Sequence, residues 1–144
     1  MPSAGSTGYD SATATRSSSV SGFPFAIEVA NLSASLKSAL SAHGSANGIR
    51  VFDSTGSTEY ARDLIDVNHI SGTGLIVFRI PGASGTSIQA RVYADATGVY
   101  LDSDTYGGHN AYDVDDEAIL PLSADFNDRT SNGVNGTGFG SVSA

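Results

Sequence analysis

The stretch GIRVFDSTGSTEYARDLIDV, residues 48–67, has two segments with apolar positions on either side of a short polar turn. Ile49 and Val51 precede the turn, and Tyr60 and later apolar residues follow it. The intervening DSTGS consists of residues that favour turns, and Gly56 tolerates a positive φ. This pattern predicts a β-hairpin. We expect residues 53–57 to reverse the chain and to carry no chemistry.

Strand patterns also occur on both sides of the hairpin. Apolar residues alternate with small or polar ones over residues 23–29, which is the period of a half-buried strand. Pro24 has no N–H group, so it belongs at an edge or at the first residues of that strand. The continuous apolar run 75–78 predicts a central strand buried on both faces. Residues 88–94 alternate again, with their apolar side chains directed inward.

The later part of the chain has weaker patterns. Residues 97–98 form a turn signal before a short strand at 99–101, and the apolar residues 118–122 are a candidate last strand. About six or seven strands separated by regular turns predict an all-β fold, a single β-sandwich of jelly-roll type. We expect the core to contain Phe25, Ile27, Val51, Ile76, Phe78, Ile80 and Val92.

One segment changes period. Leu32, Leu36 and Leu40 fall at helical spacing, with Ser33 placed to cap the start and Gly44 to end the helix. We therefore expect one short helix that packs on the sandwich or closes one end of it.

Composition suggests three regions. Residues 1–19 are rich in Ser, Thr, Ala and Gly and predict a flexible N-terminal arm. Residues 20–126 contain the strand patterns and form the β-sandwich domain. Residues 127–144 are rich in Gly, Ser and Asn and read as a C-terminal tail.

The charge pattern excludes several partners. The chain has 144 residues, a formal net charge of -8 and only seven basic residues, which are scattered singly. Without a basic cluster, nucleic acid and anionic membrane surfaces are not expected as partners. Disulfides and cysteine chemistry are excluded because there is no cysteine. The polar start lacks the basic and apolar regions of a secretory signal.

Several motifs occur in an order that resembles a known family. FPFAIEV, then the hairpin stretch, then GLIVFRIPGASGTSIQARVYADATGVY and finally DRTSNGVNGT span about residues 23–137. They resemble a bacterial and phage domain of unknown function that often precedes laminin-G or concanavalin-like lectin domains. The chain departs from the family's pattern in having no tryptophan. The resemblance implies a β-sandwich accessory module of surface and virion proteins, without catalytic residues.

A group of acidic residues is the candidate metal site. Asp102, Asp104, Asp113 and Asp115 lie close together in the sequence, and Ca²⁺ prefers such oxygen ligands. The spacing of an EF-hand is absent, so the alternative is that these carboxylates are solvated or cap turns. No other cofactor is expected, and nothing in the sequence fixes a pair of carboxylates for hydrolysis.

Tyrosines late in the chain are the candidate ligand-binding residues. Tyr100, Tyr106 and Tyr112 lie among Asn and Asp residues. Such a set suits a sugar, because a ring stacks on its apolar face while amides and carboxylates bind its hydroxyls. The alternative is that these tyrosines fill a layer of the sandwich.

These observations favour a protein without enzymatic activity. The first hypothesis is a structural virion protein of a tailed bacteriophage, as a capsid decoration, fibre-type or tail accessory module. It would contact other virion or surface proteins and associate with itself. The alternative hypothesis is a carbohydrate-binding or adhesion module located outside the cell or on its surface.

Overall fold

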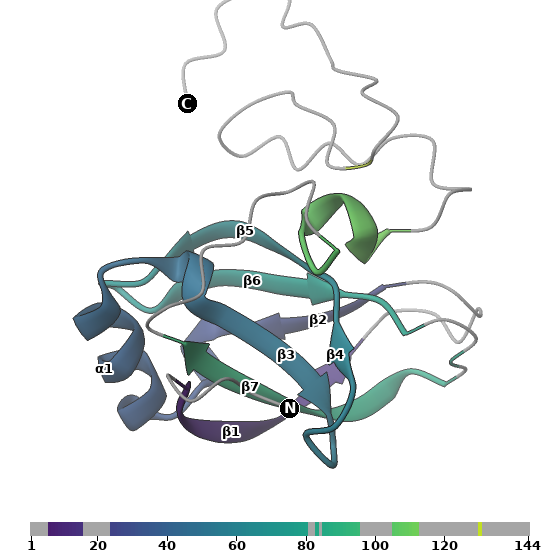
Figure 1. Ribbon diagram of the computed structural model, residues 1–144, viewed down its shortest axis with the longest axis horizontal. Helices are drawn as coiled ribbons and strands as arrows, with labels where there is room; N and C mark the ends of the chain where they lie inside the picture. Colours follow the sequence, from purple (N-terminus) through teal and green to yellow (C-terminus); the bar gives the residue numbers. More distant parts are fainter. Residues whose placement is uncertain are drawn as a thin grey trace, which may run out of the picture.

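The computed structural model describes residues 6–15, 24–80, 83, 85–95, 105–112 and 130, and the fold is given for these residues. Seven strands there form one antiparallel sheet in the order β4-β3-β7-β1-β2-β6-β5 (Figure 1). The elements are β1 (Ser6–Thr15), β2 (Phe25–Glu28), η1 (Val29–Asn31), α1 (Ala34–His43), η2 (Ala46–Gly48), β3 (Ile49–Asp53), β4 (Glu59–Tyr60), β5 (Arg62–Asn68), β6 (Thr73–Phe78), β7 (Ser87–Asp95) and η3 (Gly108–Ala111).

The sheet curls around a single main core. Val51 and Val92 come from one half of the strand order, and Ile27 and Ile76 come from the other half, yet all four belong to one buried cluster. The all-β prediction with one short helix is therefore confirmed. The layers that face each other across the core are two halves of one continuous sheet, so the molecule is close to a barrel.

The chain itself joins the two ends of the strand order. β4 and β5 lie at opposite ends of the sheet, but only Ala61 separates them in the sequence. One extended segment thus pairs first with β3, where Val51 lies opposite Tyr60, and then with β6, where Arg62 lies opposite Phe78. This switch of partner brings the ends of the sheet together.

The hairpin predicted from the opening stretch is confirmed. β3 and β4 pair antiparallel, and the Asp53 carboxylate accepts hydrogen bonds from the backbone N–H and side chain of both Thr55 and Ser57. These bonds, led by the one from the Ser57 backbone, hold the pKa of Asp53 well below its usual range. Gly56 takes a φ of 80°, as the turn requires. Both oxygens of the Asp53 carboxylate therefore accept hydrogen bonds that stabilise the turn.

The predicted helix is also present. Ser33 caps α1 by accepting a hydrogen bond from the Leu36 N–H, and Gly44 ends it in the left-handed conformation. Leu36 and Leu40 are buried in the main core. Figure 1 shows α1 at one end of the sheet, where it packs against β1 and β7. The sequence pattern therefore predicted the helix and its packing on the β-structure, and left two places open for it.

The N-terminal arm predicted over residues 1–19 is corrected for residues 6–15, which form β1, and its other residues lie outside the described ranges. Ser6–Thr15 is a strand that lies between β7 and β2 in the strand order. Its sequence looks like a solvated segment because most of its side chains are small or polar. Small residues nevertheless suit its inward face, where Ala14 is fully buried and Ala12 packs against the core.

β6 fits the predicted central strand in its second half. Ile76, Val77 and Phe78 are buried, whereas Leu75 is 37% exposed. Val77 points to the outer face, where Ala111 and Tyr112 cover it in a second small cluster. Both faces are thus buried only where the η3 segment lies over the sheet. The predicted core is confirmed for six of its residues, and Ile80 is half-buried.

Some predictions fall on residues outside the described ranges. These are the strand at 99–101, the strand at 118–122 and, apart from Thr130, the tail at 127–144. Thr130 is buried. The two strands and the tail therefore stay predictions from the sequence.

Phe78→Ala should test the core assignment. Phe78 is fully buried, and its ring stacks between those of Tyr60 and Phe25 at centroid distances of 5.8 and 6.1 Å. We expect the change to lower the free energy of unfolding by roughly 3–5 kcal/mol, measured by chemical denaturation. The control is Leu75→Ala on the same strand, which should cost less than about 1 kcal/mol. A loss below about 1 kcal/mol for Phe78→Ala would contradict the assignment.

Candidate functional site

Two of the candidate site residues from the sequence lie within the described part of the chain. Tyr106 lines a surface cleft. Tyr112 is only 5% exposed, and its hydroxyl donates to Asp63 Oδ2 at 2.7 Å. Tyr112 therefore packs as an interior tyrosine, and its ring offers no open face. The other candidates, which are Tyr100, Asp102, Asp104, Asp113 and Asp115, lie outside the described ranges.

The cleft that contains Tyr106 is the candidate site. Its volume is about 510 Å³, and it lies beside β4 and the segment that leads into η3. Aromatic, amide and charged side chains share its wall. The lining residues are Thr58, Glu59, Tyr60, Ala61, Arg79, Thr105, Tyr106 and Asn110.

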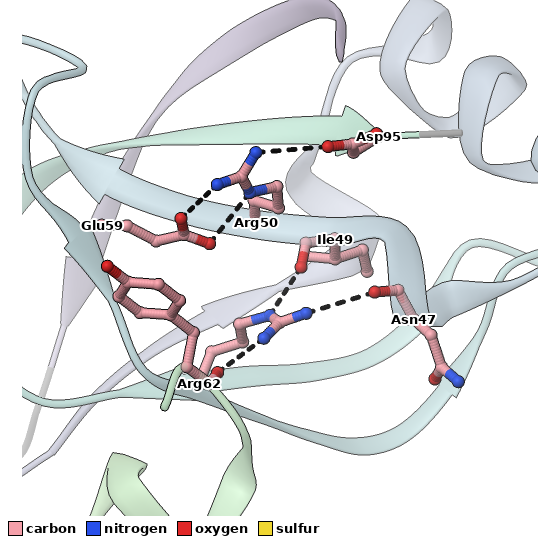
Figure 2. Close-up of polar contacts among 7 residues, drawn as sticks. Asn47, Ile49, Arg50, Glu59, Arg62 and Asp95 are labelled. Atoms are coloured by element: carbon pink, nitrogen blue, oxygen red, sulfur yellow. Dashed lines mark hydrogen bonds and ion pairs between the residues drawn. The ribbon is translucent and has the colours of Figure 1, made fainter. Parts of the chain in front are cut away.

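Arg62 holds one wall of this cleft in place. Its guanidinium donates to the carbonyl of Ile49 at 2.6 Å and to that of Asn47 at 3.2 Å (Figure 2). It also donates to the Tyr106 carbonyl at 2.5 Å, and the Arg62 backbone N–H donates to the same oxygen at 3.1 Å. The Arg62 side chain is buried among these acceptors. It therefore fixes the backbone of Tyr106 to the junction of β4 and β5.

A second buried arginine orders the acidic side of the cleft. Arg50 binds the Glu59 carboxylate with two nitrogens and donates to Asp95 Oδ2 at 3.2 Å (Figure 2). The side chains of Arg50, Glu59 and Asp95 are 9%, 4% and 2% exposed. A bidentate pair of this kind sets geometry as well as charge. The Glu59 carboxylate is thus buried against Arg50 with its charge balanced and its orientation fixed.

The segment containing η3 is tied to the outer face of the sheet. The Tyr112 hydroxyl binds Asp63 on β5, and Arg79 Nη1 donates to the Tyr112 carbonyl at 3.4 Å. Ala111 packs on Val77 beside them. Because Arg79 and Asn110 line the cleft, these contacts also define its far wall.

The cleft offers aromatic, amide and charged groups that can bind a ligand. Burial, and then the charge of Asp53, raise the pKa of Tyr60, so its hydroxyl is neutral at physiological pH and both donates and accepts. Asn110 supplies an amide and Arg79 a fixed positive charge. One face of the Tyr60 ring is occupied by Phe78, which makes the ring rigid. Such a rigid set suits recognition of a small polar ligand.

The described residues contain no group of three or more His, Cys, Asp or Glu side chains that could hold a metal ion. The four aspartates proposed for Ca²⁺ lie outside these residues, so the calcium site stays a prediction. Within the same part of the chain, no helix has the length and apolar character needed to cross a membrane.

No family model, curated protein or solved structure matches this chain. The likeness to the accessory domain is therefore still a prediction from the motifs quoted above.

Most of the cleft was missed by the sequence reasoning. It identified Tyr106 but not Tyr60, Arg79 or Asn110, because these residues meet only after the sheet curls. A usable signal was present in the arginines that interrupt apolar strands, as in ARDLIDV and IVFRIP. A basic residue among buried neighbours needs fixed acceptors, and it therefore marks a junction in the fold.

Arg62→Met should weaken the fold through this junction. The substitution leaves carbonyls of Asn47, Ile49 and Tyr106 without the guanidinium that they bind. The Tyr106 carbonyl keeps the Arg62 backbone N–H as a donor, so two acceptors, the carbonyls of Asn47 and Ile49, lose this partner. Each buried acceptor left without a partner costs about 1–3 kcal/mol, so we expect a loss of at least about 2 kcal/mol in urea denaturation. The control is Arg91→Met, which removes one hydrogen bond to the exposed turn at Thr55 and one contact with the exposed Tyr9 ring. Equal losses for the two variants would contradict the role given to Arg62.

Proposed function

We propose that this protein is a non-enzymatic binding module and that the cleft beside β4 recognises carbohydrate. One observation carries the proposal: Tyr60 and Tyr106 line the same cleft as Arg79 and Asn110. The two tyrosines come from different segments. The Tyr60 ring stacks on Phe78, and Arg62 holds the backbone of Tyr106 through its carbonyl.

The physical case rests on the two kinds of surface that a sugar presents. Its C–H face is apolar and packs on an aromatic ring, whereas its hydroxyls need donors and acceptors at fixed positions. The cleft supplies rings, two threonines, an amide and a guanidinium within one volume of about 510 Å³. Rigid side chains lose little conformational entropy on binding, which favours affinity from a small contact area.

Tyr106→Ala should abolish most of this binding. We expect a glycan array to identify a ligand, and calorimetry to show at least a tenfold weaker Kd for the variant, which corresponds to about 1.4 kcal/mol. The matched control is Tyr9→Ala, because Tyr9 is 47% exposed and lies outside the cleft. Its affinity should equal that of the unmodified protein.

Absence of saturable binding across a broad array would reject the carbohydrate proposal. Equal losses for the two tyrosine variants would place the sugar elsewhere on the surface.

A second candidate is a structural protein of a tailed bacteriophage particle. One observation favours it: Arg50, Arg62, Asp63 and Asp95 are all buried. These four charged residues are therefore absent from the surface of the part of the chain that the structure describes. Such a surface packs against a protein shell with little cost of charge desolvation.

Mass spectrometry of purified particles tests this candidate. We expect the chain in many copies per particle and retained through washing at high salt, because few of its contacts would be ionic. Its presence in the culture fluid but not in the particles would reject the candidate and leave the cleft proposal standing.

A further inference from the structure

The N-terminal strand is attached to the sheet mainly along one of its edges. β1 pairs with β7 along its whole length, from Ser6 opposite Asp95 to Thr15 opposite Ser87. On its other side, the register with β2 consists of Thr15 opposite Ala26 alone. β1 therefore fills the space between β7 and β2 but belongs mostly to β7.

The rest of the sheet is continuous without β1. It runs from β7 through β3 and β4, crosses to β5 at Ala61, and continues through β6 to β2. Arg62 fixes the crossing by binding the carbonyls of Ile49 and Asn47. The other six strands thus form a curled sheet with a slot of one strand's width between β7 and β2.

The composition of β1 suits a strand that spends time outside the slot. Among residues 8–15 of this strand, Ala12 and Ala14 pack against the core, and the large side chain of Tyr9 lies on the outer face. Most of the stabilisation then comes from backbone pairing with β7. These hydrogen bonds are the same whichever molecule supplies the strand, so exchange costs little.

Side-chain contacts make the slot specific for this strand. Gln89 Nε2 donates to Thr13 Oγ1 at 2.5 Å, and the Arg91 guanidinium lies 4.4 Å from the centre of the Tyr9 ring. The Asp10 carboxylate accepts from the Ser33 N–H at the start of α1. An unrelated strand would lack these partners, so the occupant is a second copy of β1.

The length of the connection permits exchange. Residues 16–24 separate β1 from β2, whereas most hairpin loops have about 2–5 residues. Nine residues span at most about 30 Å when extended, which reaches a neighbouring molecule. We propose that copies of this protein associate by exchanging β1, so that the strand of one molecule pairs with β7 of another. This inference does not depend on carbohydrate binding at the cleft.

A disulfide between the two strands tests the proposal directly, because the chain has no cysteine of its own. One chain carries Thr13→Cys, and an isotopically labelled chain carries Gln89→Cys. Both positions are exposed, and their side chains meet in the register. The two chains are unfolded, mixed, refolded together and oxidised. We expect mass spectrometry to find the 13–89 disulfide between a labelled and an unlabelled chain.

The matched control uses the exposed register pair Glu28 and Leu75 on β2 and β6. A mixture of Glu28→Cys and labelled Leu75→Cys should give no disulfide between positions 28 and 75, because these strands stay within one molecule. A 13–89 yield no higher than this control would overturn the proposal. Light scattering of the unmodified protein gives a second reading: a single-chain mass at every concentration would overturn it, and a dimer or larger mass agrees with it.

Discussion

The guanidinium of Arg62 joins the two ends of the sheet. A curled sheet of this size leaves carbonyl groups at its ends without strand partners, and buried carbonyls are costly when unpaired. Arg62 offers five donors in a planar arrangement, and three carbonyls around it accept from them. At Ala61 the chain stops pairing with β3 and starts pairing with β6, which brings the two ends of the sheet close together. The hydrogen bonds of Arg62 stabilise this arrangement. Side chains from both halves of the strand order then pack into one core.

The same contact links the fold to the cleft. Tyr106 is bound through its backbone carbonyl, so the position of its backbone follows from the closure of the sheet. Glu59 is held in a similar way by Arg50. Two buried arginines thus set the geometry of a surface feature, and the groups that a ligand would meet are not the groups that hold the site together.

Local patterns were enough to predict the elements whose stabilisation is local. Asp53 and Gly56 identify their turn, and Ser33 and Gly44 identify the limits of the helix, because the stabilising bonds lie within a few residues. β1 could not be recognised this way. Its strand state depends on a partner far along the chain, and its own residues give no apolar alternation. The cleft was out of reach for the same reason, since Tyr60 and Arg79 meet only through the curled sheet.

The pairing of β1 with β7 also constrains the order of events during synthesis. β1 leaves the ribosome before β7, and Thr15 pairs with Ser87 and Ser6 with Asp95, so the whole segment between the two strands must be made before β1 can pair with β7. At about 5–20 residues per second, this delay lasts several seconds or longer. An unpaired strand with many hydrophobic side chains would be prone to aggregate during that time. Because β1 has few large apolar side chains, it exposes little hydrophobic surface before it pairs with β7, which is one of the long-range contacts of the fold.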